Sequence, residues 1–187
     1  MDNRTLLQPV VENFSPQNLT TFLRTACGSF RPGEQDYGHY LHPDLPIKEF
    51  HELGRIDFSD ERRLMVIVGQ MQTELTSRTG KKKQYDLAKK VLKEELFDAG
   101  IFAFYDGSGN FRFSLVVAKY QGQQRSFSNY RRFTYFVSTN TNNRTFLDRI
   151  GQADFGSIDS IHQAFSVDPV TKEFFKVYEK LFRQAEA

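Results

Sequence analysis

The fold is decided by residues 64–105, LMVIVGQMQTELTSRTGKKKQYDLAKKVLKEELFDAGIFAFY. The stretch opens with a short apolar run rich in β-branched residues, Leu64–Met71, which predicts a buried strand interrupted near Gly69. In Lys81–Phe97 apolar residues recur at helical spacing and most lysines fall on the other side, which predicts a helix with a basic solvent face. Strand character resumes at Ile101–Tyr105. Strand, helix and strand in this order predict a βαβ crossover with parallel strands.

The residues after the crossover predict an antiparallel meander. A turn-rich pentapeptide, DGSGN at 106–110, is followed by FRFSLVVAKY at 111–120, in which apolar residues alternate. This pattern is typical of a β-hairpin. Alternation at Arg132–Val137 predicts one more strand. The expected fold class is therefore α/β, of the α+β kind: a mixed sheet with one βαβ crossover and an antiparallel meander, flanked by helices.

The first flanking helix is expected to begin at Ser15-Pro16, because serine is a favoured N-cap and proline suits the first helical position. It should end near Gly28. The glycine- and proline-rich stretch 29–46 indicates an irregular connection, and Ile47–Leu53 is interpreted as a short helical turn.

Three helices are predicted at the end of the chain. Arg144–Ile150 follows an asparagine-rich loop, and Ser157 is a suitable N-cap for Ile158–Phe165. The third starts at Asp168-Pro169 and is amphipathic, with a broad aromatic stripe. So wide a stripe requires a large partner surface, either a neighbouring domain or the sheet of this domain itself.

A length of 187 residues suits one buried core. We therefore expect an α/β domain over residues 1–165 and a linker helix over 166–187 that leads toward a following domain. The residues expected to contact that domain are Phe174, Phe175, Tyr178, Leu181 and Phe182.

Composition excludes several classes of protein. No apolar run approaches the roughly 20 residues needed to cross a bilayer, and the first residues lack a signal-peptide pattern, so a cytoplasmic protein without membrane contact is expected. The single Cys27 lies on an apolar helical pattern and is interpreted as a buried structural thiol. His39, His42 and His51 form only a weak metal constellation, and we interpret them as ordinary loop histidines, with no metal site expected.

The net charge of +2 hides a strong segregation. Residues 78–93 contain seven basic residues and one acidic residue, Asp86, and residues 107–147 contain six basic residues and no acidic one. If these cations converge in space they create a positive field that attracts DNA or RNA. Alternating basic and acidic faces on an ordinary domain would produce the same composition.

Catalytic motifs are missing. The chain contains no GxGxxG, GxxxxGK[ST], GxSxG or HExxH pattern. A metal-dependent nuclease needs an acidic residue two positions before a lysine, and none of the lysines here has one. The nearest analogue is Val117-Ala118-Lys119, which keeps the lysine and lacks the carboxylate. No catalytic residue is predicted within this chain.

Binding therefore remains as the predicted role. The arginines on and beside the hairpin could contact phosphates, while alternation turns most of the interleaved aromatic residues toward the core. Lysines at the start of the main helix could add an anion site through free amides and the helix dipole, although lysine runs are often only a solvated face. The candidate DNA-binding residues are Arg78, Lys81, Lys82, Lys83, Arg112, Lys119, Arg125, Arg131 and Arg132.

Three stretches resemble a known family: residues 81–116, which run from KKKQYDLAKK to FRFSLV, RRFTYFVSTNTNNRTFLDRI at 131–150, and SIHQAFSVDPVTKEFFKVYEKLF at 160–182. They resemble the N-terminal region of type IIG single-chain restriction-modification enzymes, in which this region precedes an adenine-specific DNA methyltransferase. The resemblance covers roughly residues 60 to 182. It implies DNA and the methyltransferase domain of a longer chain as partners.

The same resemblance implies S-adenosylmethionine, and Mg²⁺ where a nuclease is present, as cofactors of a full-length enzyme. The Asn-Pro-Pro-aromatic methylation motif is absent, so no cofactor is expected in this chain. Two alternatives to a DNA-engaging module stay open. One is a protein-interaction module that docks through its final helix. The other is a divergent Mg²⁺-dependent nuclease that uses a carboxylate such as Asp57 or Glu74.

Overall fold

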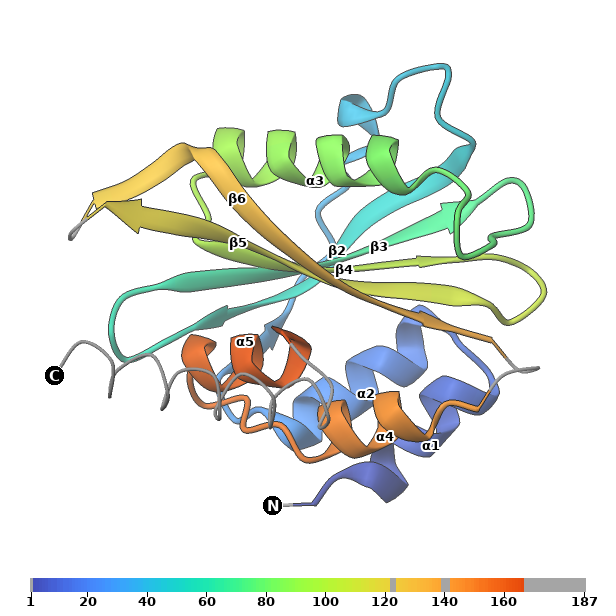
Figure 1. Ribbon diagram of the computed structural model, residues 1–187, viewed down its shortest axis with the longest axis horizontal. Coiled ribbons are helices and arrows are strands. Elements are labelled where there is room, and N and C mark those ends of the chain that lie inside the picture. The colour runs from blue at the N-terminus through green and yellow to red at the C-terminus, as the bar shows by residue number, and fades with distance from the viewer. Residues whose placement is uncertain (1, 122–123, 139–141, 167–187) are drawn as a thin grey trace, which may run out of the picture.

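A six-stranded sheet forms the centre of the protein (Figure 1). The computed structural model describes residues 2–121, 124–138 and 142–166, with only the backbone described between 120 and 129. The strands follow chain order across the sheet, and β3 and β4 form its one parallel pair. The strands are β1 (Phe30–Pro32), β2 (Ile47–Asp57), β3 (Arg63–Met71), β4 (Ala99–Tyr105), β5 (Phe111–Gln121) and β6 (Gln124–Val137).

Helices cover both faces of the sheet unequally (Figure 1). One face carries α3 (Lys81–Glu95) and a short 3₁₀ turn at Gly38–Tyr40, and the other carries α1 (Arg4–Glu12), α2 (Pro16–Ala26), α4 (Arg144–Gly151) and α5 (Ile158–Ser166). The α/β class, the βαβ crossover through α3 and the β4–β5–β6 meander are confirmed.

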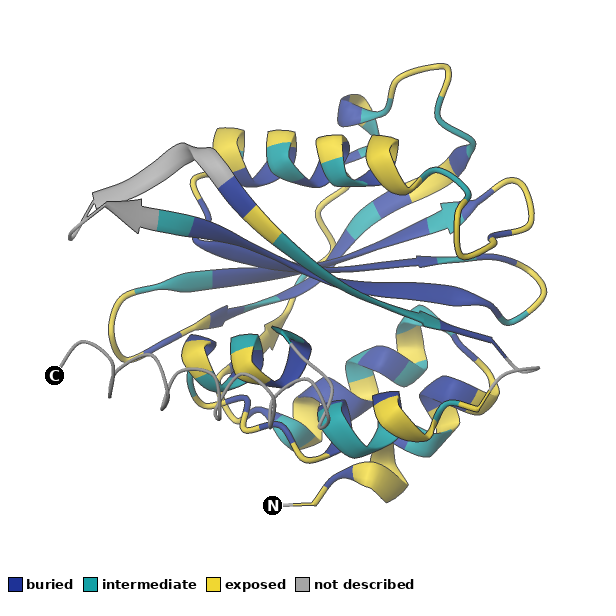
Figure 2. Cartoon of the chain, viewed as in Figure 1, coloured by how far each residue is buried: buried dark blue, intermediate teal, exposed yellow. Residues whose placement is uncertain are grey.

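Two hydrophobic cores result, one on each side of the sheet. Because successive strand residues point to opposite faces, Leu64, Val66 and Val68 of β3 enter the core under the four helices, while Met65 and Ile67 enter the core under α3. Figure 2 shows the central strands as an almost unbroken buried layer between the two helical layers. Burial on both faces explains why the β3 sequence is mostly apolar and does not alternate.

The predicted helical turn at Ile47–Leu53 is wrong, because these residues begin strand β2. The error has a physical cause in two register shifts of the β2–β3 ladder, one after Ile47 and one after Glu52. Each shift places two apolar residues three positions apart on one face: Ile47 and Phe50 in the α3-side core, and Leu53 and Ile56 in the other. A spacing of three imitates a helix.

Gly69 does not interrupt β3, which runs continuously and pairs Gly69 with Phe50 and Phe104. A Cβ atom added at Gly69 would lie 2.7 Å from the Phe104 ring. The glycine thus makes room for an aromatic side chain from the neighbouring strand.

The predicted helix starts are confirmed where a serine caps them. The Ser15 hydroxyl accepts a hydrogen bond from the Asn18 amide at 3.0 Å, and the Ser157 hydroxyl accepts one from the Ser160 amide at 3.1 Å. Helix α2 ends at Ala26, short of Gly28, and Cys27 is buried as expected. Helix α1 was not anticipated, and the predicted final helix from Asp168 lies outside the described residues.

Candidate functional site

The N-terminus of α3 is a cationic surface. Gly80 adopts the left-handed conformation at the N-cap, no side chain caps the helix, and no acidic residue lies in its first turn. Lys81, Lys82 and Lys83 are exposed, as is Arg78 in the preceding loop. None of these four has an acidic partner in the part of the chain that the structure describes. Uncapped amides and the helix dipole add to this positive charge, which favours an anion.

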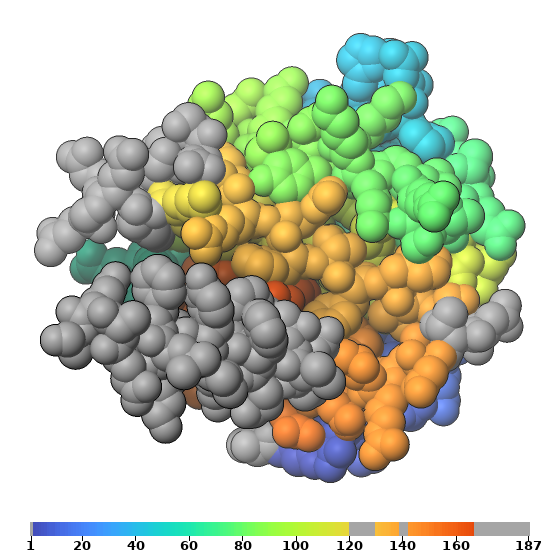
Figure 3. Space-filling view, viewed as in Figure 1, coloured from blue at the N-terminus to red at the C-terminus, as the bar shows by residue number. Residues whose placement is uncertain are grey.

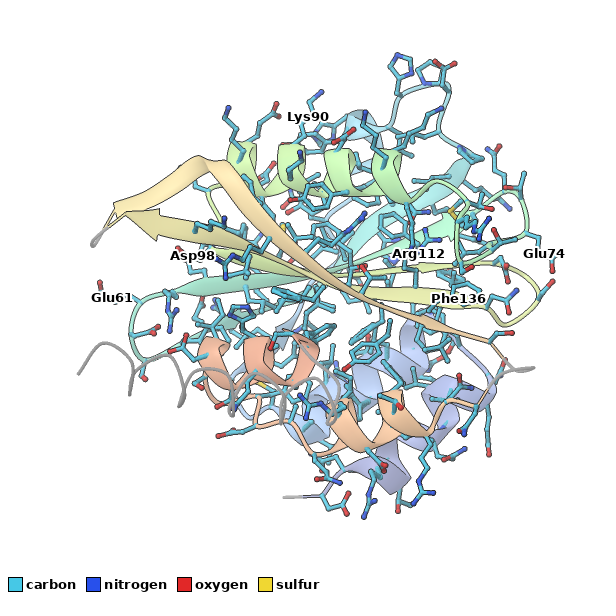
Figure 4. The ribbon with its side chains drawn as sticks, in the orientation of Figure 1. Glu61, Glu74, Lys90, Asp98, Arg112 and Phe136 are labelled. Carbon is cyan, nitrogen blue, oxygen red and sulfur yellow. The ribbon has the colours of Figure 1, made fainter. Side chains whose placement is uncertain are left out.

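Arg112, on strand β5, fixes the loop that precedes α3. Its guanidinium donates hydrogen bonds to the carbonyl oxygens of Thr76 at 2.6 Å and Thr79 at 2.9 Å, and to the Gln84 side chain. Figure 4 shows Arg112 between the sheet and α3. Its side chain is only 1% exposed, so the prediction that Arg112 contacts DNA is wrong. Because side chains alternate along β5, Arg112 points to the α3 side of the sheet. There it bonds to carbonyl groups of a loop, and a count of charges in the sequence does not reveal such partners.

Burial has an electrostatic cost at this arginine. Removal from water and, to a smaller extent, the nearby positive charge of Arg132 together lower the pKa of Arg112 to about 10. Among the described residues no carboxylate bonds to Arg112, and the partners of its guanidinium are neutral oxygens. The guanidinium thus fixes the loop at some expense of desolvation.

The β4–β5 turn holds the other end of the same loop. The Asp106 carboxylate accepts a hydrogen bond from the Leu75 amide at 2.5 Å, and the Asn110 side chain donates to the Leu75 carbonyl at 3.3 Å. Asp106 also accepts from the Ser108 and Asn110 amides. The DGSGN segment is thus a hairpin turn, as predicted, and also a support for the loop that carries Arg78.

The two basic segments of the sequence meet where α3 lies beside β6. We call this contact the α3–β6 junction and define it by Lys81, Tyr85, Lys89, Tyr130 and Arg132. The Arg132 guanidinium donates to the Lys81 carbonyl at 2.7 Å and lies 4.7 Å from the Tyr85 ring centre. The Lys89 ammonium lies 4.5 Å from the same ring centre. The Tyr85 hydroxyl donates to the Tyr130 carbonyl at 3.0 Å.

Tyr85 is the centre of this junction, although its place in the sequence predicted only a packing role. The electron-rich faces of the Tyr85 ring stabilise both cations. The spacing of four residues between Tyr85 and Lys89 on the predicted helix is the sequence signal that could have indicated their contact. In the space-filling view of Figure 3, α3 and β6 adjoin on one continuous surface.

Arg131 and Arg132 lie on opposite faces of the sheet. Arg132 lies under α3, whereas Arg131 lines a cleft of about 320 Å³ on the α5 side, together with Arg62, Lys119, Asp159 and His162. Consecutive residues of a strand alternate in this way. The candidate cations of the hairpin therefore serve two separate surfaces. Arg125 lies on β6 where only the backbone is described, and the five predicted interdomain residues lie outside the described residues.

The aromatic residues of β6 are engaged in packing, as alternation predicted. Phe133 and Tyr135 pack against the core under the four helices, and Phe136 packs against the core under α3. The Tyr135 hydroxyl donates to the Ala164 carbonyl at 2.9 Å. Stacking of these rings on nucleic-acid bases receives no support from their positions.

The carboxylates and imidazoles of the described residues do not form a group of three or more that could hold a metal ion. Asp57 forms ion pairs with Arg31 and Arg63, and Glu74 is exposed in the loop after β3. The His39 ring lies 4.4 Å from the Tyr40 ring in a tilted arrangement, and His42 lies 3.4 Å from the carboxylate of Asp44. The nuclease alternative gains no support from these positions.

Comparisons with known proteins assign this chain to no family. No protein-family model and no curated protein sequence matches it. Among solved structures, a putative family II inorganic pyrophosphatase from Methanococcus jannaschii aligns with 84% of this chain at 13% sequence identity and a TM-score of 0.33. The alignment spans 43% of the length of that pyrophosphatase chain. In the part of the chain described by the structure, no helix has the length and apolar character required to cross a bilayer.

Proposed function

We propose that this chain is a DNA-engaging module that contacts the phosphate backbone with the N-terminus of α3 and the α3–β6 junction. In this proposal it belongs to a restriction-modification DNA methyltransferase and either holds the DNA or positions the neighbouring domain. In this proposal the catalytic groups come from outside this chain. The methyltransferase, with its S-adenosylmethionine, would be the following domain of the same longer chain.

The observation that carries the proposal is the contact of Arg132, from the second basic segment, with the first basic segment. Residues 78–93 and 107–147 are separate in sequence, and Arg132 joins them by bonding to Lys81 and stacking on Tyr85. Convergence was the condition under which acid-poor segments create a field strong enough to attract a polyanion. An alternation of basic and acidic faces would not require the segments to meet.

The geometry favours backbone contact over base reading. Lysine ammonium groups act as mobile point charges, which suits phosphates and provides no bidentate pattern for a base edge. Arg132 has a guanidinium that could read a base, but that group is engaged by Lys81 and Tyr85. Affinity should therefore depend strongly on salt and weakly on sequence, because counterion release dominates such contacts.

The test is the salt dependence of binding to a labelled DNA duplex, measured by fluorescence anisotropy. Each phosphate contact contributes about −0.9 to the slope of log K against log salt concentration. A variant carrying Lys82→Glu and Lys83→Glu should bind at least about tenfold more weakly, with a slope that is smaller by about 2. Acidic residues in the first turn suit the helix dipole, so α3 should stay folded.

A matched control carries Arg24→Glu and Arg144→Glu. Both arginines are exposed in the four-helix layer, and the net charge changes by the same amount. The control should bind DNA with nearly the wild-type slope. Equal losses in both variants would mean that net charge alone attracts DNA, and undetectable wild-type binding at low salt would overturn the proposal.

A further inference from the structure

We propose that the cleft between α5 and the β5–β6 ends, the α5–β6 cleft, binds one phosphate group. The cleft is lined by Arg62 from the β2–β3 turn, Lys119 from β5, Arg131 from β6, and Asp159 and His162 from α5. This site lies across the sheet from the α3–β6 junction, and the inference does not rest on the proposed function.

The charges of the cleft leave two cations without a carboxylate. Asp159 is engaged by Arg62, whose guanidinium nitrogens lie 3.1 and 3.3 Å from its two oxygens. Lys119 and Arg131 have no acidic partner within the described residues. The lining is therefore net doubly positive, which matches a phosphate monoester or inorganic phosphate, whose charge is about −1.5 to −2 at neutral pH.

Neighbouring groups fix the walls of the cleft. Asp60 also pairs with Arg62, at 2.7 Å, so that two carboxylates orient one guanidinium. The His162 ring lies 4.9 Å from the Phe133 ring. Burial lowers the pKa of His162 and the charge of Arg131 lowers it further, with Asp159 acting in the opposite direction, so the imidazole is neutral at neutral pH. A neutral imidazole can donate one hydrogen bond to a phosphate oxygen.

The size of the cleft suits a small ligand. Its volume of about 320 Å³ is at the lower end of the range for small-molecule sites. A register shift between Ala118 and Lys119 breaks the regular β5–β6 ladder at this point. Such irregularities often redirect a side chain near a binding site, and here the residue after the shift is Lys119.

Inorganic phosphate is the probe for the first experiment, with ionic strength held constant by sodium chloride. The His162 imidazole resonances in a ¹H–¹³C spectrum, assigned with His162→Gln, report on the cleft. We expect a saturable shift with phosphate that chloride does not reproduce. Arg131→Gln and Lys119→Gln should each weaken the apparent affinity about tenfold, the usual effect of losing one charged hydrogen bond. Arg24→Gln, remote on α2, should leave it unchanged.

A second experiment separates the two sources of a phosphate group. If a DNA duplex displaces the bound inorganic phosphate in wild type and in Lys82→Glu/Lys83→Glu, the cleft takes a phosphate of the DNA backbone. If phosphate stays bound in the presence of saturating DNA, the ligand is a free phosphate compound. The proposal is overturned if no saturable shift occurs, or if the shift survives in the Arg131→Gln/Lys119→Gln double variant with an unchanged circular dichroism spectrum.

Discussion

The two faces of the sheet are covered by different means. Within the described residues four helices cover one face, and in its core the Phe113 ring stacks on Phe165 and meets Phe146 edge to face. In the described part of the chain the other face has a single long helix, and Arg112 and Gln84 fill part of the space beneath it. A single helix is too narrow to cover a six-stranded sheet. A buried arginine can therefore fill the space between a helix and a sheet, so a basic composition does not imply an equally basic surface.

The largest expected effect tests how completely side chains are buried on the two faces of the sheet. Phe113→Ala should lower the free energy of unfolding by about 3–5 kcal/mol, because the ring is fully buried under the four helices. Phe136→Ala on the α3 side removes a half-buried ring and should cost about 1–2 kcal/mol. Urea denaturation measures both. Equal costs would mean that the α3 side is packed as thoroughly as the other.

Arg112→Met tests whether the buried arginine holds the loop before α3. The substitution leaves the Thr76 and Thr79 carbonyls and the Gln84 side chain without their donor, which should cost about 1–3 kcal/mol. Arg112→Lys should not restore stability, because an ammonium group lacks the planar fork. Hydrogen exchange at residues 76–80 should also accelerate. A variant at least as stable as wild type would show that desolvation of the charge outweighs its three bonds.

Leu96→Gly tests the C-terminal end of α3, the helix on the less covered face of the sheet. Leu96 caps α3 in the left-handed conformation, with φ of 60°, and is 57% exposed. Glycine adopts this conformation without strain, so the variant should be more stable by about 1 kcal/mol in thermal or urea unfolding. Lys93→Gly, three residues earlier inside the helix, should be less stable by about the same amount. A destabilised Leu96→Gly variant would indicate that the leucine contributes more by contact than it costs in strain.

His162→Gln should have the smallest effect, and only at acidic pH. Because burial lowers the pKa of His162 in the folded protein, the unfolded chain binds the proton more readily. The folded state thus loses stability as pH falls below about 6.5, the ordinary histidine value. The variant lacks this loss, so its stability relative to wild type should be constant above about pH 7 and improve toward pH 5. A pH-independent difference would contradict the burial of His162.

Sequence patterns predicted those parts of the fold that depend on local periodicity. The β3–α3–β4 crossover and the β4–β5 hairpin follow from runs, spacing and turn residues, and serine caps placed the starts of α2 and α5. Strand β2 escaped prediction because two register shifts gave its apolar residues a spacing of three. A shift of register is set by the neighbouring strand, so it leaves no unambiguous trace in a single segment.

The candidate site could be predicted only as a list of charges. Lys81, Lys82 and Lys83 are exposed, as a lysine-rich helix face suggests. The fate of each arginine depends on partners distant in sequence: Arg112 meets the carbonyls of residues 76 and 79, and Arg131 and Arg132 reach opposite sides of the sheet. Arg62 and His162 were not linked to any site because their meeting requires the β2–β3 turn to lie beside α5.

The single parallel pair in the sheet has a consequence for how the chain folds. It divides the strands into two antiparallel meanders, β1–β2–β3 and β4–β5–β6, each built from neighbours in sequence. Contacts between nearby residues form faster than distant ones, because a short loop costs less entropy to close. Each meander can therefore assemble on its own, and the β3–β4 ladder must wait until α3 spans the gap between them. The rate of folding should depend on α3 more than on any other helix.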